Sequence, residues 1–106
     1  MRDEDEREIA PSELWQSSMM ANAARDPLWR AVVSAEIAAA PAAEEAIGNK
    51  CTTCHSPMAW TDARLLDEPL PTMDVLVDET ERMDLALDGV SCTLCHQIEG
   101  DNLGTE

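Results

Sequence analysis

The pentapeptides Cys51-Thr52-Thr53-Cys54-His55 and Cys92-Thr93-Leu94-Cys95-His96 are the stretches on which the interpretation of this sequence depends. We refer to them as the first motif and the second motif. Both have the pattern Cys-x-x-Cys-His, and together they contain all 4 cysteines and both histidines of the 106-residue chain. A chain of this composition would contain one such pattern by chance roughly 0.003 times. Two copies are therefore not a coincidence.

The spacing within each motif is typical of covalent c-type haem attachment. Two thiols must reach the two vinyl groups on one edge of the porphyrin, and residues three positions apart lie on the same side of a helix. The histidine that follows supplies an imidazole nitrogen to the iron as the proximal ligand. The motifs thus predict two haem c groups, with thioether bonds from Cys51, Cys54, Cys92 and Cys95 and proximal iron ligands from His55 and His96.

Other uses of four cysteines explain fewer of these residues. A zinc site would have to join Cys54 and Cys92 across 37 intervening residues, beyond the roughly 15 to 20 that are typical of zinc ribbons, and it needs no histidine after each pair. A thioredoxin-like redox pair requires flanking β-strands, which the sequence does not indicate. Two disulfide bonds would leave both histidines unexplained.

The composition agrees with a cofactor-filled interior. Hydrophobic residues make up 44% of the chain, but there is no Phe, no Tyr and only 3 Trp. The chain is long enough for one domain, and its small or flexible apolar side chains specify a packed core only weakly. We therefore expect the two haems to take the place of large aromatic side chains.

The fold class predicted from the sequence is all-α, because no segment shows a sustained period-two alternation. We expect four or five short helices and long loops wrapped around the two covalently bound haems. Residues 1–10 are interpreted as a flexible acidic segment, 11–106 as the dihaem domain, and 100–106 as a tail. Helices are predicted over 12–25, 27–40, 42–47, 51–60 and from about 78 to 89.

Several residues are predicted to delimit these helices. Ser12 and Asp26 are candidate N-caps, with Pro27 in the first position of the second helix. Gly48 and Gly89 precede the two motifs and are expected to end helices, so that each motif can turn towards its porphyrin. Residues 69–71 contain two prolines and predict a loop.

The distal iron ligand is left open by the residues themselves. Since both histidines are used as proximal ligands, the distal position needs a methionine, Lys50, another chain or water, or stays empty. Met58 follows His55 too closely to reach the far face of its own haem, although it could serve the other one. The internal candidates are Met19, Met20, Met58, Met73 and Met83.

Three stretches resemble the N-terminal part of multihaem c-type cytochromes, which are exported electron carriers: 18–29, 48–58 and 88–98. The resemblance covers most of 12–104, although only the two motifs are highly specific. It implies Met20 as the first choice of distal ligand, on a helix over a haem. Met83, on the helix that leads into the second motif, is the second choice. Similar proteins are usually longer, so the chain could be a small dihaem relative or part of a larger multihaem cytochrome.

The resemblance also implies a location outside the cytoplasm, periplasmic or extracellular. Residues 1–10 lack the apolar region of a signal peptide. An export signal is therefore expected to have been removed or replaced by Met1. No apolar stretch approaches the roughly 18 residues of a transmembrane helix.

The net charge of the chain limits the kinds of partner that we expect it to bind. The net charge of −15 argues against nucleic acid and anionic membranes and favours redox proteins with a basic docking surface. The leading hypothesis is electron transfer without catalysis. The alternative is a haem enzyme, such as a dihaem peroxidase or a small-molecule reductase, with one open iron. Self-association into a haem chain is a third hypothesis, which the acidic surface does not favour.

Overall fold

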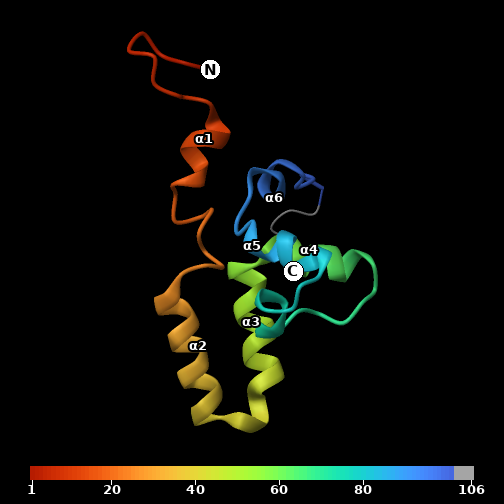
Figure 1. Cartoon of the computed structure of the whole chain (residues 1–106). Helices are drawn as coiled ribbons and strands as arrows, with labels where there is room; N and C mark the ends of the chain where they lie inside the picture. Colours follow the sequence, from red (N-terminus) through yellow and green to blue (C-terminus); the bar gives the residue numbers. More distant parts are fainter. Residues whose placement is uncertain (102–106) are drawn as a thin grey trace.

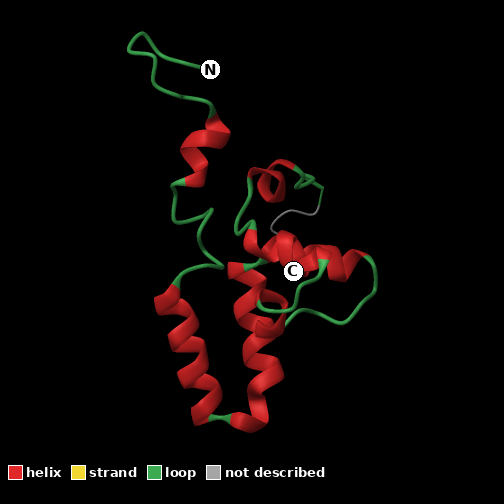
Figure 2. Ribbon diagram, in the orientation of Figure 1, coloured by secondary structure: helices red, strands yellow, loops and turns green. Residues whose placement is uncertain are grey.

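The computed structural model describes residues 1–101, and its architecture is all-α, as predicted (Figure 1 and Figure 2). Four of the helices have seven or more residues, and loops separate most of them. In chain order, with η for a 3-10 helix, the elements are α1 (Pro11–Gln16), α2 (Pro27–Ala39), η1 (Pro41–Ala43), α3 (Glu44–His55), α4 (Pro57–Leu65), η2 (Met73–Leu76), α5 (Glu81–Leu87) and α6 (Cys92–His96).

Helices α2 and α3 form an antiparallel hairpin that is closed by η1 (Figure 1). The predicted start of α2 is confirmed: the Asp26 carboxylate accepts a hydrogen bond from the Leu28 N–H at 2.8 Å, and Pro27 occupies the first turn. The predicted end is also confirmed, because the chain leaves α2 at Ala40 and Pro41 begins η1. This hairpin brings the first motif beside the N-terminal part of α2.

The prediction for Gly48 is wrong. Helix α3 does not end there but continues through Gly48 to His55, so the predicted helix over 42–47 and the first motif are one element. A Cβ atom on Gly48 would lie 3.0 Å from the Thr72 Cβ. The glycine therefore serves the close approach of two chain segments and does not make a turn.

The prediction for Gly89 is confirmed. It follows the end of α5 with a φ of +63°, the left-handed conformation that glycine adopts without steric cost. A Cβ atom here would lie 2.5 Å from the Met20 carbonyl oxygen and 2.8 Å from that of Ala21. Gly89 thus combines a turn with a close contact to the segment after α1.

Other helix boundaries differ from the predictions. The helix expected over 12–25 ends at Gln16, and Ala10, not Ser12, is its N-cap. Turns follow, in which the Asn22 side-chain amide donates to the carbonyls of Gln16 and Ser18 at 3.1 and 2.9 Å. These bonds satisfy carbonyls that a longer helix would have used itself.

Two further helix boundaries, at Ser56 and Glu81, also differ from the predictions. The helix expected over 51–60 is interrupted at Ser56, because Pro57 lacks an N–H and starts the new helix α4. Helix α5 begins at Glu81, not near Asp78. The predicted loop over 69–71 is confirmed.

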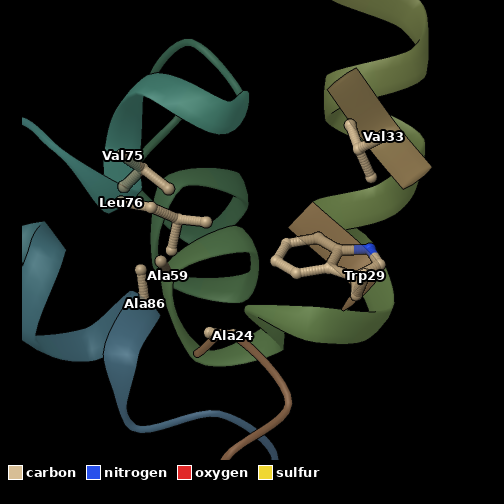
Figure 3. Packing of buried hydrophobic residues seen from close by; sticks show 7 residues of the cluster. All are labelled: Ala24, Trp29, Val33, Ala59, Val75, Leu76 and Ala86. Carbon is tan, nitrogen blue, oxygen red and sulfur yellow. The ribbon is translucent and has the colours of Figure 1, made fainter. Parts of the chain in front are cut away.

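The hydrophobic core is thin (Figure 3). Five of the nine buried hydrophobic residues in the described part of the chain are alanines. The Cα radius of gyration is 16.1 Å, whereas a compact domain of this length is expected to have about 13 Å. Residues 1–10, which project away from the helices (Figure 1), contribute to this larger radius. The central cluster consists of Ala24, Trp29, Val33, Ala59, Val75, Leu76 and Ala86.

The N-terminal residues 1–10 extend away from the helices (Figure 1) and carry local ion pairs, such as Arg2 with Glu8 at 2.7 Å and Arg7 with Asp3 at 2.8 Å. Their flexibility stays a prediction. Most of the predicted tail, 102–106, lies outside the described residues. None of the helices within 1–101 combines the length and the apolar character needed to cross a bilayer.

Candidate haem-attachment site

Both motifs are helical, which places their reactive side chains together. The first motif ends α3 and the second motif makes up α6. In a helix, positions i, i+3 and i+4 share one face, so the two cysteines and the histidine of each motif lie on the same side. All four cysteines are unpaired; three are exposed and Cys51 is half-buried. The thiols are therefore available for bonds to a ligand.

The His55 imidazole has a defined proton. Its Nδ1 atom lies 2.9 Å from the carbonyl oxygen of Ala23. Because a carbonyl can only accept, this hydrogen bond puts the proton on Nδ1 and leaves the lone pair of Nε2 free. Histidines that bind metals almost always donate their other N–H to an oxygen in this way, which fixes the tautomer and the orientation of the ring.

Trp29 packs against the face of the same imidazole. The indole and imidazole rings are stacked, with centroids 4.1 Å apart and planes within 4°. Trp29 belongs to α2 and is buried in the central cluster (Figure 3), so it cannot easily move away. Two contacts from distant parts of the chain thus hold His55 before any ligand is present.

Thr52 links the first motif to the loop that precedes η2. Its buried hydroxyl donates to the carbonyl oxygen of Pro71 at 2.7 Å and lies 3.0 Å from that of Asn49. The contact joins α3 to the loop before η2, on the side of the helix that does not carry the cysteines. One hydroxyl thereby replaces the water that the Pro71 carbonyl would otherwise need.

The Cys51 thiol is less acidic than an ordinary thiol. Burial raises its pKa, and the neighbouring Cys54 and Glu36 act in the same direction. Glu36 belongs to α2, which packs against α3 along the hairpin.

The second motif is held mainly through the residues before it. The Val90 N–H donates to the Met20 carbonyl oxygen at 2.9 Å, and the Trp15 indole N–H donates to the Val90 carbonyl oxygen at 3.0 Å. Arg25 adds a hydrogen bond to the carbonyl of Leu87 at the end of α5. The reactive side chains themselves, Cys92, Cys95 and His96, are exposed.

Residues 20–23 therefore contact the first motif and the chain just before the second motif. The carbonyl of Ala23 accepts from the first motif, and the carbonyl of Met20 accepts from the residue two positions before the second motif. Sequence reasoning missed both contacts, because a main-chain carbonyl leaves no signal in the sequence. It placed Trp29 within the helix predicted over 27–40, without the contact to His55.

The structure separates the methionine candidates. Met19 lines a cavity of about 510 Å³ together with His55, whereas Met20 is half exposed and contributes its carbonyl to the second motif. Met73 lies in η2 against α3, and Met83 is half-buried on α5. The choice of Met20 and Met83 as distal ligands stays a prediction.

Met58 lines a second cavity of about 510 Å³ beside α6, with Thr93 and Leu94. These two residues are the variable positions of the second motif. The cavity therefore places Met58 next to α6, and its role as a distal ligand to the haem of the second motif stays a prediction.

The described residues contain no group of three or more His, Cys, Asp and Glu side chains that could share a metal ion, so the two motifs do not converge on a single zinc site. No family model, no curated protein and no solved structure matches the chain. The assignment of a function thus depends on the motifs and on their geometry.

Proposed function

We propose that this chain is a small dihaem c-type cytochrome that carries single electrons. Thioether bonds from Cys51 and Cys54 would hold one haem and those from Cys92 and Cys95 the other, with His55 and His96 as proximal ligands. When bound, haem supplies an iron that changes reversibly between the ferric and ferrous states.

The observation that carries this proposal is the state of His55. Its Nδ1–H donates to Ala23, its ring is stacked on Trp29, and its Nε2 lone pair is free. Histidines that bind metals almost always donate their other ring N–H to an oxygen, which fixes the tautomer and the orientation of the ring, and His55 has this arrangement. The same residue stands directly after two unpaired cysteines on one helical face.

The thin core gives independent support. Five of the nine buried hydrophobic residues in the described part of the chain are alanines, and large apolar side chains such as Met19, Leu28 and Val32 are exposed, so the polypeptide leaves apolar surface uncovered. Two large flat apolar cofactors would cover such surface and exclude water from it. This agrees with a chain that contains neither Phe nor Tyr.

Electron transfer is favoured over catalysis by the small number of acid–base side chains in the chain. Both histidines are assigned as proximal ligands and the chain contains no Tyr, whereas a peroxidase or reductase needs acid–base groups that are free to act on a substrate.

The acidic surface points to the partner. With a net charge of −15, the protein would attract a redox protein with a basic docking surface, and the association rate would fall as salt is added. We place this exchange in the periplasm or outside the cell, where c-type cytochromes act.

Haem loading tests the proposal directly. The chain is exported in a host with a haem attachment system, and its intact mass is measured together with that of two variants, Cys51→Ser/Cys54→Ser and Cys92→Ser/Cys95→Ser. We expect the mass of the polypeptide plus two haems for the natural sequence and plus one haem for each variant. A colourless product with the mass of the bare polypeptide would refute the proposal.

Spectroscopy separates the carrier from an enzyme. A low-spin ferric spectrum with a weak band at the red end indicates methionine ligation, whereas a high-spin spectrum with ready binding of carbon monoxide indicates an open iron. Met20→Ala and Met83→Ala should each convert one haem to high spin. If both variants stay low-spin, the distal assignment is wrong, and Met19→Ala is the next variant to measure.

A further inference from the structure

Helix α2 exposes two large apolar side chains on one side. Leu28 is 71% exposed and Val32 is 50% exposed, and the two residues lie one helical turn apart, so their side chains are neighbours. The next residues on the helix, Trp29 and Val33, are buried in the central cluster (Figure 3). Exposed and buried apolar side chains thus alternate around the same two turns of α2.

The exposed pair faces away from η2. Ile37 lines a cavity with Met73 of η2, and it lies about 80° from Trp29 around the helix axis. Val32 and Leu28 lie about 60° and 100° from Trp29 in the opposite direction. Segment 71–76 therefore covers one face of the hairpin, and Leu28 and Val32 belong to the other.

The first motif is divided in the same way. Gly48 and Thr52 contact residues 71–73, and around the axis of α3 they lie about 60° and 100° from Cys51 on one side. Cys54 lies about 60° to the other side and is exposed. Because α2 and α3 run antiparallel and pack side by side, rotation in the same sense about each helix axis leads from the contact between them to the same face of the hairpin. Ile37 on α2 and Gly48 and Thr52 on α3 therefore lie on the face that contacts η2. Cys54 and Val32 thus share the open face of the hairpin.

The two groups also lie at the same height along the hairpin. Trp29 is stacked on His55, and the two helices run antiparallel from there to η1, which closes the hairpin. Val32 is three residues along α2 from Trp29 and therefore lies near the level of Thr52, three residues before His55 and between Cys51 and Cys54. Leu28 lies one turn further from η1, so the apolar pair begins beside the cysteines and extends past the end of α3.

We propose that Leu28 and Val32 form the surface on which the porphyrin bound to Cys51 and Cys54 lies. The inference deepens the proposed function and depends on it. Its occupant is defined by the anchors: a planar apolar group tethered at Cys54 on the open face removes the adjacent leucine and valine from water. The tether also keeps the group next to this surface, so no separate binding event is needed.

Hydroxyl-radical labelling of the dihaem protein tests this surface. Leu28 and Val32 should be protected in the natural protein and in Cys92→Ser/Cys95→Ser, which keeps the first haem, and labelled several-fold more in Cys51→Ser/Cys54→Ser. Val77, which is 69% exposed and lies just after η2, is the matched control and should not change. Equal labelling of Leu28 and Val32 with and without the first haem would overturn the inference.

The variant without the first haem could unfold, and strong labelling of Val33, which is 2% exposed in the structure, would reveal this. Methyl NMR of the natural dihaem protein tests the inference without that variant. In the reduced protein, the porphyrin ring current should shift the methyl signals of Val32 and Leu28 but not those of Val77. Unshifted Val32 signals would overturn the inference. An intact mass with two haems shows at the same time that the proposed function itself still stands.

Discussion

The first and second motifs have the same pattern but very different surroundings. The first motif is the end of a 12-residue helix, and its histidine, its buried threonine and one cysteine all contact other parts of the chain. The second motif is a helix of only 5 residues, none of them buried. The pentapeptide thus defines the chemistry, while distant residues define how firmly it is held.

Under the proposed function, this difference predicts two kinds of haem site. In the first site the polypeptide fixes the proposed iron ligand, His55, in advance. In the second site, order must come from the haem, since the exposed side chains lose conformational freedom only on attachment. The following variants compare the two motifs, from the largest expected effect to the smallest.

Trp29→Ala should have the largest effect and should act on the first site. Removal of a buried tryptophan typically costs about 3 to 5 kcal/mol of unfolding free energy, and here it also removes the ring stacked on His55. Thermal unfolding gives the stability loss. Haem spectra recorded in the Cys92→Ser/Cys95→Ser background should change, whereas those in the Cys51→Ser/Cys54→Ser background should change less. Equal spectral changes at both haems would contradict the comparison.

Gly89→Ala should weaken the entry to the second motif. A left-handed φ costs an alanine about 1–2 kcal/mol, and its Cβ would also collide with the Met20 carbonyl, so we expect a loss of at least about 2 kcal/mol in denaturant unfolding. Gly48→Ala is the matched control. Its contact is with a side chain at 3.0 Å, and the helix propensity of alanine offsets part of the cost. Similar losses for both variants would show that Gly89 is not the special position.

Thr52→Val and Thr93→Val compare the same position in the two motifs. The first change leaves the buried Pro71 carbonyl without its donor and should cost about 1–3 kcal/mol. The second changes an exposed residue and should stay within about 0.5 kcal/mol. Urea unfolding of the two dihaem variants measures the difference, and a large loss for Thr93→Val would mean that the second motif is as firmly packed as the first.

Cys51 should be alkylated more slowly than Cys92 when the haem-free chain is treated with iodoacetamide. Burial limits access to Cys51 and raises its pKa, so less of the reactive thiolate is present at neutral pH, and its rate should climb as the pH is raised. The native haem-free chain holds this proton more tightly than the unfolded chain. Its stability should therefore fall once the pH exceeds the ordinary thiol pKa. Mass spectrometry of digested samples gives both rates, and a faster reaction of Cys51 would contradict the structure.

Local features of the fold could be predicted from the sequence. Asp26 with Pro27, the prolines at 69 and 71 and the turn at Gly89 each act within a few residues, and the structure confirms them. Gly48 was misjudged because a glycine before a motif fits either a helix end or a close contact. Only Thr72, 24 positions further along the chain, distinguishes the two.

The surroundings of the candidate site could not be predicted in the same way. The cysteines and histidines are specified by their own identities, but the partners of His55 are a carbonyl of Ala23 and the face of Trp29. Every residue has a carbonyl, and a tryptophan in an apolar stripe fits an ordinary core equally well. These contacts depend on how α2 and the preceding turns pack on α3, which is a property of the whole fold.

Residues 20–23 are linked to the first motif and to the residue two positions before the second motif by main-chain carbonyls, one from Ala23 and one from Met20. Side-chain replacements at these positions leave the carbonyls in place. Sequence divergence in this turn can therefore alter its surface and its volume while preserving the spacing between the two histidines proposed to bind iron. The distance between the two proposed haem centres, which would govern the rate of electron transfer between them, would then change little when side chains in this turn are mutated.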